Sequence, residues 1–402
     1  MALNASVYSA MPNSGGGGAQ MGLSGMGGEA LSNAPSVSYP DRPARIAYSN
    51  ARYEIATLLR TCVDSKASDL HLAVGRPPVL RINGSLHDID GPNLTAAESR
   101  RLIYGILNDL QKQKYEENKE LDLSLSVANL ARFRVNVHYQ RGSVAAAFRT
   151  IDAEIRNFED LHLPKRVMEH LARRPAGFVL ITGPTGAGKS TTLAAMIDLI
   201  NRERDCHIVT IEDPIEYLHP HKRSLIEQRE INDDTFSFTN ALKYALRQDP
   251  DVLMIGEMRD LETIASALTA AETGHLVFST LHTIGVVQTV DRIIDVFPPH
   301  QQEQVRIQLA SVLEGVICQK LLTSISRGRE LAVEVMLATD AVRNQIREGN
   351  THTIQGTIES GGKWGMLTMD RSILDLYRQS RISRETALLA CNKPDEMRRL
   401  MG

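Results

Sequence analysis

The clearest pattern in the chain is a strict alternation of apolar and polar residues over residues 131–140. The odd positions from Phe133 onward are apolar, and the even positions are polar or basic. Successive side chains of a strand point to opposite faces, so this segment is predicted to be a half-buried strand. The Arg-Gly-Ser sequence at 141–143 supplies a turn, and residues 144–150 are predicted to return as the partner strand.

The segment before this hairpin contains helical and strand patterns of its own. A helical pattern comes first, and two strand-like segments follow, the second of which turns at Asn83-Gly84. A second amphipathic helix is predicted to begin after Thr95, its N-cap, with Glu98 in the position of a capping box. Together these elements predict a small α+β domain over residues 49–150.

The pattern changes after this domain. Residues 151–165 are a polar-interrupted connector, predicted to be an inter-domain linker. Beyond it, short and almost continuously apolar strands alternate with amphipathic helices, which is typical of a parallel sheet buried on both faces. An α/β domain is therefore predicted over residues 166–340. From about residue 300 the chain is predicted to be mostly helical, with a C-terminal helical region over residues 341–402.

Composition limits the possible classes of protein. Residues 1–48 are rich in Gly, Ser, Ala and Met and nearly uncharged, so they are predicted to be a disordered tail. The formal charge of -3 argues against a protein that mainly coats nucleic acid. The 4 cysteines form no CxxC pair, which excludes a cysteine-rich zinc site. With no signal peptide or membrane-spanning run recognisable, a cytoplasmic protein is expected.

The strongest chemical signal is GPTGAGKS at 183–190, which has the spacing of a phosphate-binding P-loop between a predicted strand and a predicted helix. Its glycines let the backbone curl so that successive N–H groups point at phosphate oxygens. Lys189 is predicted to reach the β and γ phosphates and Ser190 to bind Mg²⁺, so ATP and Mg²⁺ are the expected ligands. The predicted nucleotide-binding residues are Gly183, Pro184, Thr185, Gly186, Ala187, Gly188, Lys189, Ser190 and Thr191.

Two predicted strands end in acidic residues, which phosphoryl transfer needs near the metal ion and the attacking water. Ligands of open parallel sheets bind at these carboxyl ends. Glu257 is predicted to activate the water. Because Gly256 stands where an aspartate is common, Glu212 is predicted to be the second acid and the adjacent Asp213 a metal ligand beside Ser190. Strand-end acids are also common helix N-caps, which is the structural alternative for Asp213 and Asp260.

Two histidines, His275 and His282, lie at either end of the apolar strand 276–281. They could form a metal pair, supply a general base or sense a bound ligand. Seven residues of strand cover about 23 Å, so the two imidazoles cannot share one metal ion. Glu257 is the better candidate for water activation. His282 is therefore predicted to sense the γ-phosphate or to bond the acids, and His275 to have a structural or inter-domain role.

Four segments together resemble motifs of the secretion ATPases, the motors of type II and type IV secretion and of type IV pili. The segments GPTGAGKST, TIEDPIEYLHPH, QDPDVLMIGEMRD and TGHLVFSTLHT are similar to the family's Walker A, Asp box, Walker B and His box. AVRNQIREG at 341–349 resembles a motif of the pilus retraction motors, although Gln345 stands where an apolar residue is usual. The resemblance implies a RecA-like P-loop ATPase core, a smaller PAS-like α+β N-terminal domain and a helical C-terminal region.

The resemblance also implies a function and an assembly. The expected protein is an ATP hydrolase, a homohexamer that powers type IV pilus retraction in twitching motility. ATP is expected between the C-terminal domain of one subunit and the N-terminal domain of the next, where Arg134 and Arg149 contact its phosphates. The alternative, without the resemblance, is that both arginines lie on the solvated face of an antiparallel sheet. The linker is the expected hinge, and the expected partner is the inner-membrane platform protein at the pilus base.

Three alternatives remain open from the sequence. A pilus-assembly or type IV secretion ATPase shares these motifs, although the chain lacks the tetracysteine motif and the large extra N-terminal domain of an assembly motor. A RecA-type DNA motor would show DNA-stimulated turnover, and the slightly acidic charge predicts none, so no nucleic-acid partner is expected. A non-hydrolysing ring would show no turnover dependent on Glu257.

Overall fold

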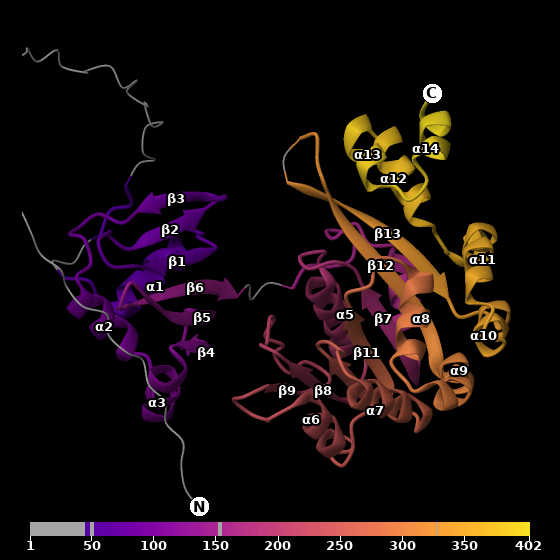
Figure 1. The fold of residues 1–402 in the computed structure, drawn as a ribbon, viewed down its shortest axis with the longest axis horizontal. Coiled ribbons are helices and arrows are strands. Elements are labelled where there is room, and N and C mark those ends of the chain that lie inside the picture. Colours follow the sequence, from indigo (N-terminus) through magenta and orange to yellow (C-terminus); the bar gives the residue numbers. More distant parts are fainter. Residues whose placement is uncertain (1–44, 49–51, 152–154, 327) are drawn as a thin grey trace, which may run out of the picture. The chain divides into compact units, whose positions relative to one another are not determined.

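The computed structural model describes residues 45–48, 52–151, 155–326 and 328–402. These residues belong to one compact unit that begins at Pro43. Two β-sheets, of six and seven strands, form its framework (Figure 1). Most of the predicted tail and residues 152–154 of the predicted linker lie outside the described residues. Ile46, inside the range predicted as tail, hydrogen-bonds through its backbone to Asp88 and Asp90, so regular structure begins earlier than predicted.

The six-stranded sheet is antiparallel throughout and has the order β3-β2-β1-β6-β5-β4. Its strands are β1 (Asp69–Leu72), β2 (Val79–Ile82), β3 (Ser85–Asp88), β4 (Glu120–Val127), β5 (Ala131–Gln140) and β6 (Ser143–Ile151). The same part of the chain contains the helices α1 (Ile55–Asp64), α2 (Ala96–Tyr104) and α3 (Asp109–Asn118). The predicted capping box of α2 is present, because Thr95 Oγ1 accepts from Glu98 N at 3.2 Å.

The alternation that predicted β5 defines the core of this sheet. Phe133, Val135 and Val137 are fully buried, whereas Arg134 is exposed on the other face. Sequence reasoning missed α3 and β4. The polar helix α3 has Tyr115 as its buried residue, and a capping box rather than an apolar face marks its start.

The seven-stranded sheet has the order β13-β12-β7-β11-β10-β8-β9, and every neighbouring pair is parallel except β12 and β13. Its strands are β7 (Gly177–Thr182), β8 (His207–Glu212), β9 (Leu225–Glu230), β10 (Val252–Ile255), β11 (Leu276–Leu281), β12 (Leu313–Thr323) and β13 (Arg329–Leu337). Four of these, β7, β8, β10 and β11, are the predicted apolar strands.

The prediction of a mostly helical chain from about residue 300 is wrong for residues 313–337. Residues 313–323 and 329–337 within this range form the antiparallel pair β12 and β13, and β12 pairs with β7 inside the sheet. Ile317 and Val316 are both fully buried, on opposite faces of β12. A strand that is buried on both faces has a continuous apolar pattern, which periodicity alone does not distinguish from a buried helix.

Helices cover both faces of this sheet, as its alternating core residues show. Phe178 and Leu180 of β7 belong to one core, and Val179 and Ile181 belong to the other. The first core includes α6 (Phe238–Ala245), α7 (Leu261–Glu272), α8 (Val286–Asp295) and α9 (Pro299–Val312). The second includes α4 (Lys165–Ala172) and α5 (Lys189–Glu203). The predicted α/β layering is therefore present.

The predicted C-terminal helical region is present and contributes to the first core. Its elements are α10 (Asp340–Arg347), η1 (Thr351–Thr353), α11 (Ile354–Ser360), η2 (Gly361–Trp364), α12 (Met369–Arg378), α13 (Arg384–Ala390) and α14 (Pro394–Met401). Gln345 of α10 donates to Thr357 of α11 at 2.9 Å. A hydrogen bond thus anchors α10 at the position where the resembling motif usually has an apolar side chain.

Candidate functional site

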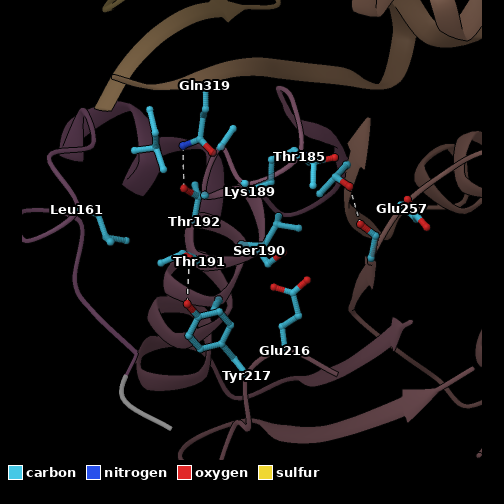
Figure 2. Close-up of a pocket in the computed structure, with 18 of the residues that line it drawn as sticks. Leu161, Thr185, Lys189, Ser190, Thr191, Thr192, Glu216, Tyr217, Glu257 and Gln319 are labelled. Atoms are coloured by element: carbon cyan, nitrogen blue, oxygen red, sulfur yellow. Dashed lines mark hydrogen bonds between the residues drawn. The ribbon is translucent and has the colours of Figure 1, made fainter. Parts of the chain in front are cut away.

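The carboxyl ends of β7, β8, β10 and β11 meet at one edge of the seven-stranded sheet, because these strands run parallel. A cavity of about 1000 Å³ opens at this edge (Figure 2). All but two of the predicted site residues line it, namely Arg134, Arg149, Thr185, Gly186, Ala187, Gly188, Lys189, Ser190, Thr191, Glu212, Asp213, Glu257 and His282. Gly183 and Pro184 precede them in the same loop.

The backbone of the P-loop has the conformation that its glycines permit. Gly183, Gly186 and Gly188 all have positive φ, at 140°, 77° and 89°. A Cβ on Gly183 would lie 2.4 Å from the carbonyl oxygen of Gln319 in β12, so only glycine fits against that strand. The loop therefore turns tightly before α5 begins at Lys189.

The side chain of Lys189 points back toward this loop. Its Nζ donates to the carbonyl oxygens of Gly183 at 2.9 Å and Pro184 at 3.2 Å. Burial lowers the pKa of Lys189, and the negative charges of Glu216 and Glu257 act in the opposite direction. The ammonium group is therefore close enough to two acids, from two different loops, to interact with both.

Two hydrogen bonds fix the start of α5, and the sequence motifs signal neither partner. Thr191 Oγ1 and Tyr217 OH are 2.9 Å apart, and Gln319 Nε2 donates to Thr192 Oγ1 at 2.8 Å (Figure 2). Tyr217 follows β8 and Gln319 belongs to β12. The P-loop helix is thus connected to the acidic loop after β8 and to a strand that sequence reasoning missed.

Glu257 follows β10 directly after Gly256. A Cβ on Gly256 would lie 3.3 Å from the Ile211 carbonyl oxygen, so a side chain at this position would be tightly packed against β8. The Glu257 carboxylate forms an ion pair with Arg259 and lies 3.3 Å from His282 Nε2. Asp260 caps α7 by accepting from Thr263 N at 2.8 Å. The alternative prediction for Asp260, a helix N-cap, is therefore confirmed.

The two histidines have different partners at opposite ends of β11. His282 lines the cavity and contacts Glu257. His275 Nδ1 lies 2.8 Å from the carbonyl oxygen of Ala270 and 3.1 Å from Thr273 Oγ1, both at the end of α7. His275 therefore closes a helix, whereas His282 belongs to the candidate site.

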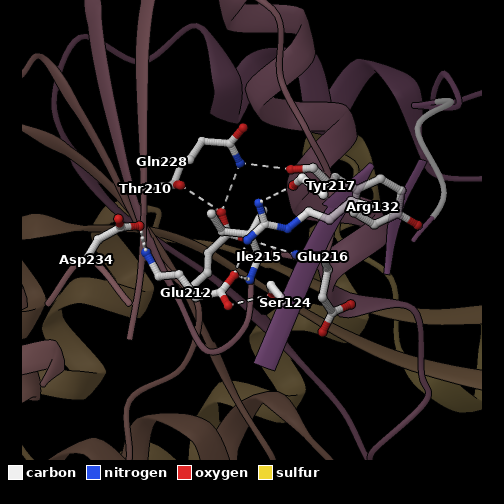
Figure 3. Close-up of polar contacts among 11 residues, drawn as sticks. Ser124, Arg132, Thr210, Glu212, Ile215, Glu216, Tyr217, Gln228 and Asp234 are labelled. Atoms are coloured by element: carbon white, nitrogen blue, oxygen red, sulfur yellow. Dashed lines mark hydrogen bonds and ion pairs between the residues drawn. The ribbon is translucent and has the colours of Figure 1, made fainter. Parts of the chain in front are cut away.

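Glu212 is buried, with 7% of its surface exposed, and its carboxylate accepts three hydrogen bonds. Its Oε1 accepts from Thr210 Oγ1 at 2.7 Å and from Gln228 Nε2 at 3.2 Å, and its Oε2 accepts from Glu216 N at 3.3 Å (Figure 3). Burial raises the pKa of Glu212 to about 7, although these hydrogen bonds act to lower it. The predicted second acid thus holds the backbone of the loop that follows it.

Glu216 lines the cavity as well. Figure 2 shows its side chain directed toward the segment that carries Ser190. Asp213 also lines the cavity, and burial followed by the charge of Glu257 raises its pKa. Which of the acids after β8 faces the P-loop depends on the path of the loop, so the sequence alone does not identify it.

Arg134 and Arg149 are direct cross-strand partners in β5 and β6. Arg149 Nε forms a hydrogen-bonded ion pair with Asp69 of β1 at 3.0 Å. Both arginines line the cavity that contains this chain's own P-loop. They bring positive charge from one sheet to a site built on the other.

The candidate metal ligands fit an ion that is held partly by phosphate oxygens better than an ion that is held by protein ligands alone. Nowhere in the described ranges do three or more His, Cys, Asp or Glu side chains form a cluster that could hold a metal ion. Mg²⁺ in phosphate sites typically has one or two protein ligands and completes its shell with phosphate oxygens and water. Ser190 and Asp213, which both line the cavity, match that requirement.

Comparison with known proteins agrees with this geometry. The model of the type II/IV secretion system protein family matches residues 51–361. The type IV pilus retraction ATPase PilT of Pseudomonas aeruginosa is 47% identical over 83% of this chain and 97% of its own length. A twitching motility protein of Neisseria gonorrhoeae is 47% identical over 86% of this chain and 92% of its own. A crystal structure of the pilus retraction motor PilT with bound ADP superposes with a TM-score of 0.82, at 48% identity, over 87% of this chain and 100% of that one.

The chain therefore belongs to the type II/IV secretion ATPase family. The predicted fold class is confirmed, with a RecA-like P-loop ATPase core and a smaller α+β domain. The predicted function, an ATP hydrolase of the pilus retraction type, is confirmed as well. Nucleotide binding is the part of the cofactor prediction that these relatives support.

Proposed function

We propose that the protein forms a homohexamer and hydrolyses ATP with Mg²⁺ to drive retraction of a type IV pilus. The observation that carries the proposal is the lining of one cavity by the P-loop, Glu257 and two arginines from the other sheet. A P-loop by itself binds nucleotide. Hydrolysis also requires an acid near the attacking water and positive charge near the developing negative charge.

The chemistry follows from the positions of these groups. The backbone N–H groups of residues 183–191 and Lys189 bind the phosphates. Glu257 orients a water for in-line attack on the γ-phosphorus, and the bond to the bridging oxygen of ADP breaks. His282, 3.3 Å from Glu257, senses the γ-phosphate and adjusts that carboxylate. Mg²⁺, bound by Ser190, Asp213 and phosphate oxygens, would neutralise charge on the phosphates.

Arg134 and Arg149 line the cavity of their own chain. In the proposed ring, as in the family that the chain resembles, they act on the nucleotide of a neighbouring subunit. A guanidinium group near the γ-phosphate stabilises the transition state without a proton transfer. The linker at residues 151–165 is the hinge, because hinges lie at loop positions that absorb backbone rotation. Binding and release of nucleotide would then change the distance between the two domains, in one subunit after another around the ring.

The proposed place of work is the cytoplasmic face of the inner membrane at the pilus base, with the pilus platform protein as the partner. No helix in the described part of the chain is long and apolar enough to cross a membrane. The support for the pilus as the object of the motor is the likeness to retraction ATPases along more than four fifths of the chain.

Phosphate release by the purified protein tests the chemistry. Glu257→Gln keeps the shape of the side chain but removes its charge, and a loss of about a hundredfold or more in kcat is expected. Glu303→Gln, at an exposed position on α9, is the matched control and is expected to keep wild-type turnover. Wild-type protein without turnover would instead identify a non-hydrolysing ring, and stimulation by DNA a DNA motor.

Lys189→Ala in the source cell tests the direction of the motor. Loss of twitching with an excess of surface pili is the expected result, because pili would still assemble but would not retract. Cells without pili would contradict retraction and identify an assembly motor.

A further inference from the structure

Glu230 is a buried carboxylate that the proposed mechanism does not use. It is the last residue of β9 and pairs in register with Glu212, the last residue of β8. Only 3% of its surface is exposed. Two buried acids therefore lie side by side at the edge of the sheet where the cavity opens.

These two acids hold consecutive backbone groups of one loop. Glu230 Oε2 accepts from Ile215 N at 3.0 Å, and Glu212 Oε2 accepts from Glu216 N at 3.3 Å (Figure 3). The side chain attached to the second of these groups is the Glu216 carboxylate in the cavity. Glu230 and Glu212 therefore fix the backbone that positions the Glu216 side chain relative to Lys189.

The other hydrogen bonds of the Glu230 carboxylate come from the six-stranded sheet. Ser124 Oγ of β4 donates to Glu230 Oε1 at 2.5 Å, and Arg132 Nη2 of β5 donates to Oε2 at 2.5 Å (Figure 3). The Arg132 side chain is itself 15% exposed. One carboxylate oxygen thus accepts from both the Arg132 guanidinium and the loop before Glu216.

Arg132 is connected to the nucleotide cavity by its own strand as well. Arg134 lies two residues further along β5, on the same face, and lines the cavity. A displacement of β5 that withdraws Arg134 therefore also withdraws Arg132 from Glu230. A buried carboxylate that loses its cation is strongly disfavoured, so Glu230 would have to move or take up solvent.

We propose that Glu230 is a positioning residue that couples the β4–β5 strands to the Glu216 loop. When Ser124 and Arg132 bind it, Glu230 holds Ile215 and thereby keeps Glu216 directed at the P-loop. When they leave, the loop loses this support and Glu216 loses its position. Hydrolysis in a subunit would then proceed only while its own β4–β5 strands hold Glu230. The inference deepens the proposed function, on which it rests, because the coupling matters only in a site that hydrolyses ATP.

The test is steady-state ATPase activity of the purified full-length protein. Arg132→Gln removes the cation without changing Glu230 or Ile215 themselves. A fall in kcat of about tenfold to a hundredfold is expected, because small displacements of reacting groups have effects of this size, with KM for ATP almost unchanged. Arg132→Lys retains the charge and is expected to restore part of the lost kcat. Arg100→Gln, which removes an exposed ion pair with Glu116, is the matched control.

The double variant Arg132→Gln/Glu216→Gln separates coupling from a merely structural role. If Arg132 acts through Glu216, the double variant is no slower than Glu216→Gln alone. Multiplied losses in the double variant, or an unchanged kcat in a folded Arg132→Gln protein, would overturn the inference; thermal unfolding shows whether each variant is folded. A wild-type protein without Glu257-dependent turnover would refute the proposed function itself, which is a different outcome.

Discussion

Replacement of Glu212 by glutamine is expected to change how the free energy of unfolding depends on pH. Glu212 is buried beneath the cavity, and three donors from Thr210, Gln228 and the Glu216 backbone occupy its carboxylate. Burial nevertheless dominates and raises the pKa of this group from 4.5 to about 7. The folded protein therefore binds a proton between these two values that the unfolded chain has already released.

The sign and size of the effect follow from this difference. Because the folded state binds more protons, stability is highest below pH 4.5 and decreases as the pH rises toward 7. A shift of this size corresponds to about 3 kcal/mol in all, and to about 2.5 kcal/mol between pH 5 and pH 8. Glutamine does not titrate. The free energy of unfolding of Glu212→Gln, relative to that of the wild type, should therefore rise by about 2.5 kcal/mol between pH 5 and pH 8.

Urea unfolding followed by circular dichroism measures this quantity at several pH values, without nucleotide or Mg²⁺. Glu303→Gln controls for the loss of one carboxylate at an exposed position on α9. The informative quantity is the difference between variant and wild type at each pH, because all other titrating groups cancel. A difference that is the same at pH 5 and pH 8 would refute the reasoning, since burial of Glu212 would then have no effect on its ionisation.

Two further predictions concern the assembly and the fold. Lys189→Ala and Arg134→Ala are each expected to inactivate a ring of identical subunits. Rings assembled from both variants should recover part of the ATPase activity, because some interfaces then combine an intact P-loop with an intact arginine. No recovery would show that Arg134 acts within its own subunit. Ile317→Ala in β12 is expected to lower the free energy of unfolding by about 2 to 5 kcal/mol, measured by urea unfolding, since the side chain is fully buried in an interior strand. A loss below about 1 kcal/mol would contradict the placement of β12 inside the sheet.

The carboxylates at the ends of β8 and β9 and in the loop after β8 have two kinds of environment. Glu212 and Glu230 are buried and bind backbone N–H groups, whereas Glu216 lies in the cavity and interacts electrostatically with Lys189. We interpret the first two as supports of the third. On this interpretation, substitution of Glu212 affects catalysis by displacing the loop, and substitution of Glu216 affects it directly.

Local patterns in the sequence were sufficient for several features of this protein. The P-loop could be predicted because its glycines and Lys189 must occur at fixed spacing for a backbone to surround phosphate. The strand β5 could be predicted because one face is buried and the other is not, which leaves a period of two in the sequence. The start of α2 was readable for a similar reason, since Thr95 and Glu98 interact with nearby backbone.

Other features depend on contacts between residues far apart in the chain. The strands β9, β12 and β13 were missed, because a strand acquires its identity from its neighbours in the sheet, and β12 is buried on both faces. The motif around residues 210–217 contains Glu212, Asp213 and Glu216 but carries no information about which of them faces the P-loop.

By itself the sequence determined the family, the phosphate site and the layered α/β core, because each depends on short-range spacing. The contacts of the acids around this site come from the tertiary structure. Thr210 and Gln228 donate to Glu212, and Arg132, about a hundred residues earlier in the chain, donates to Glu230. A buried carboxylate must be hydrogen-bonded, and its donors here come from strands that are far apart in the sequence, so no local pattern predicts them.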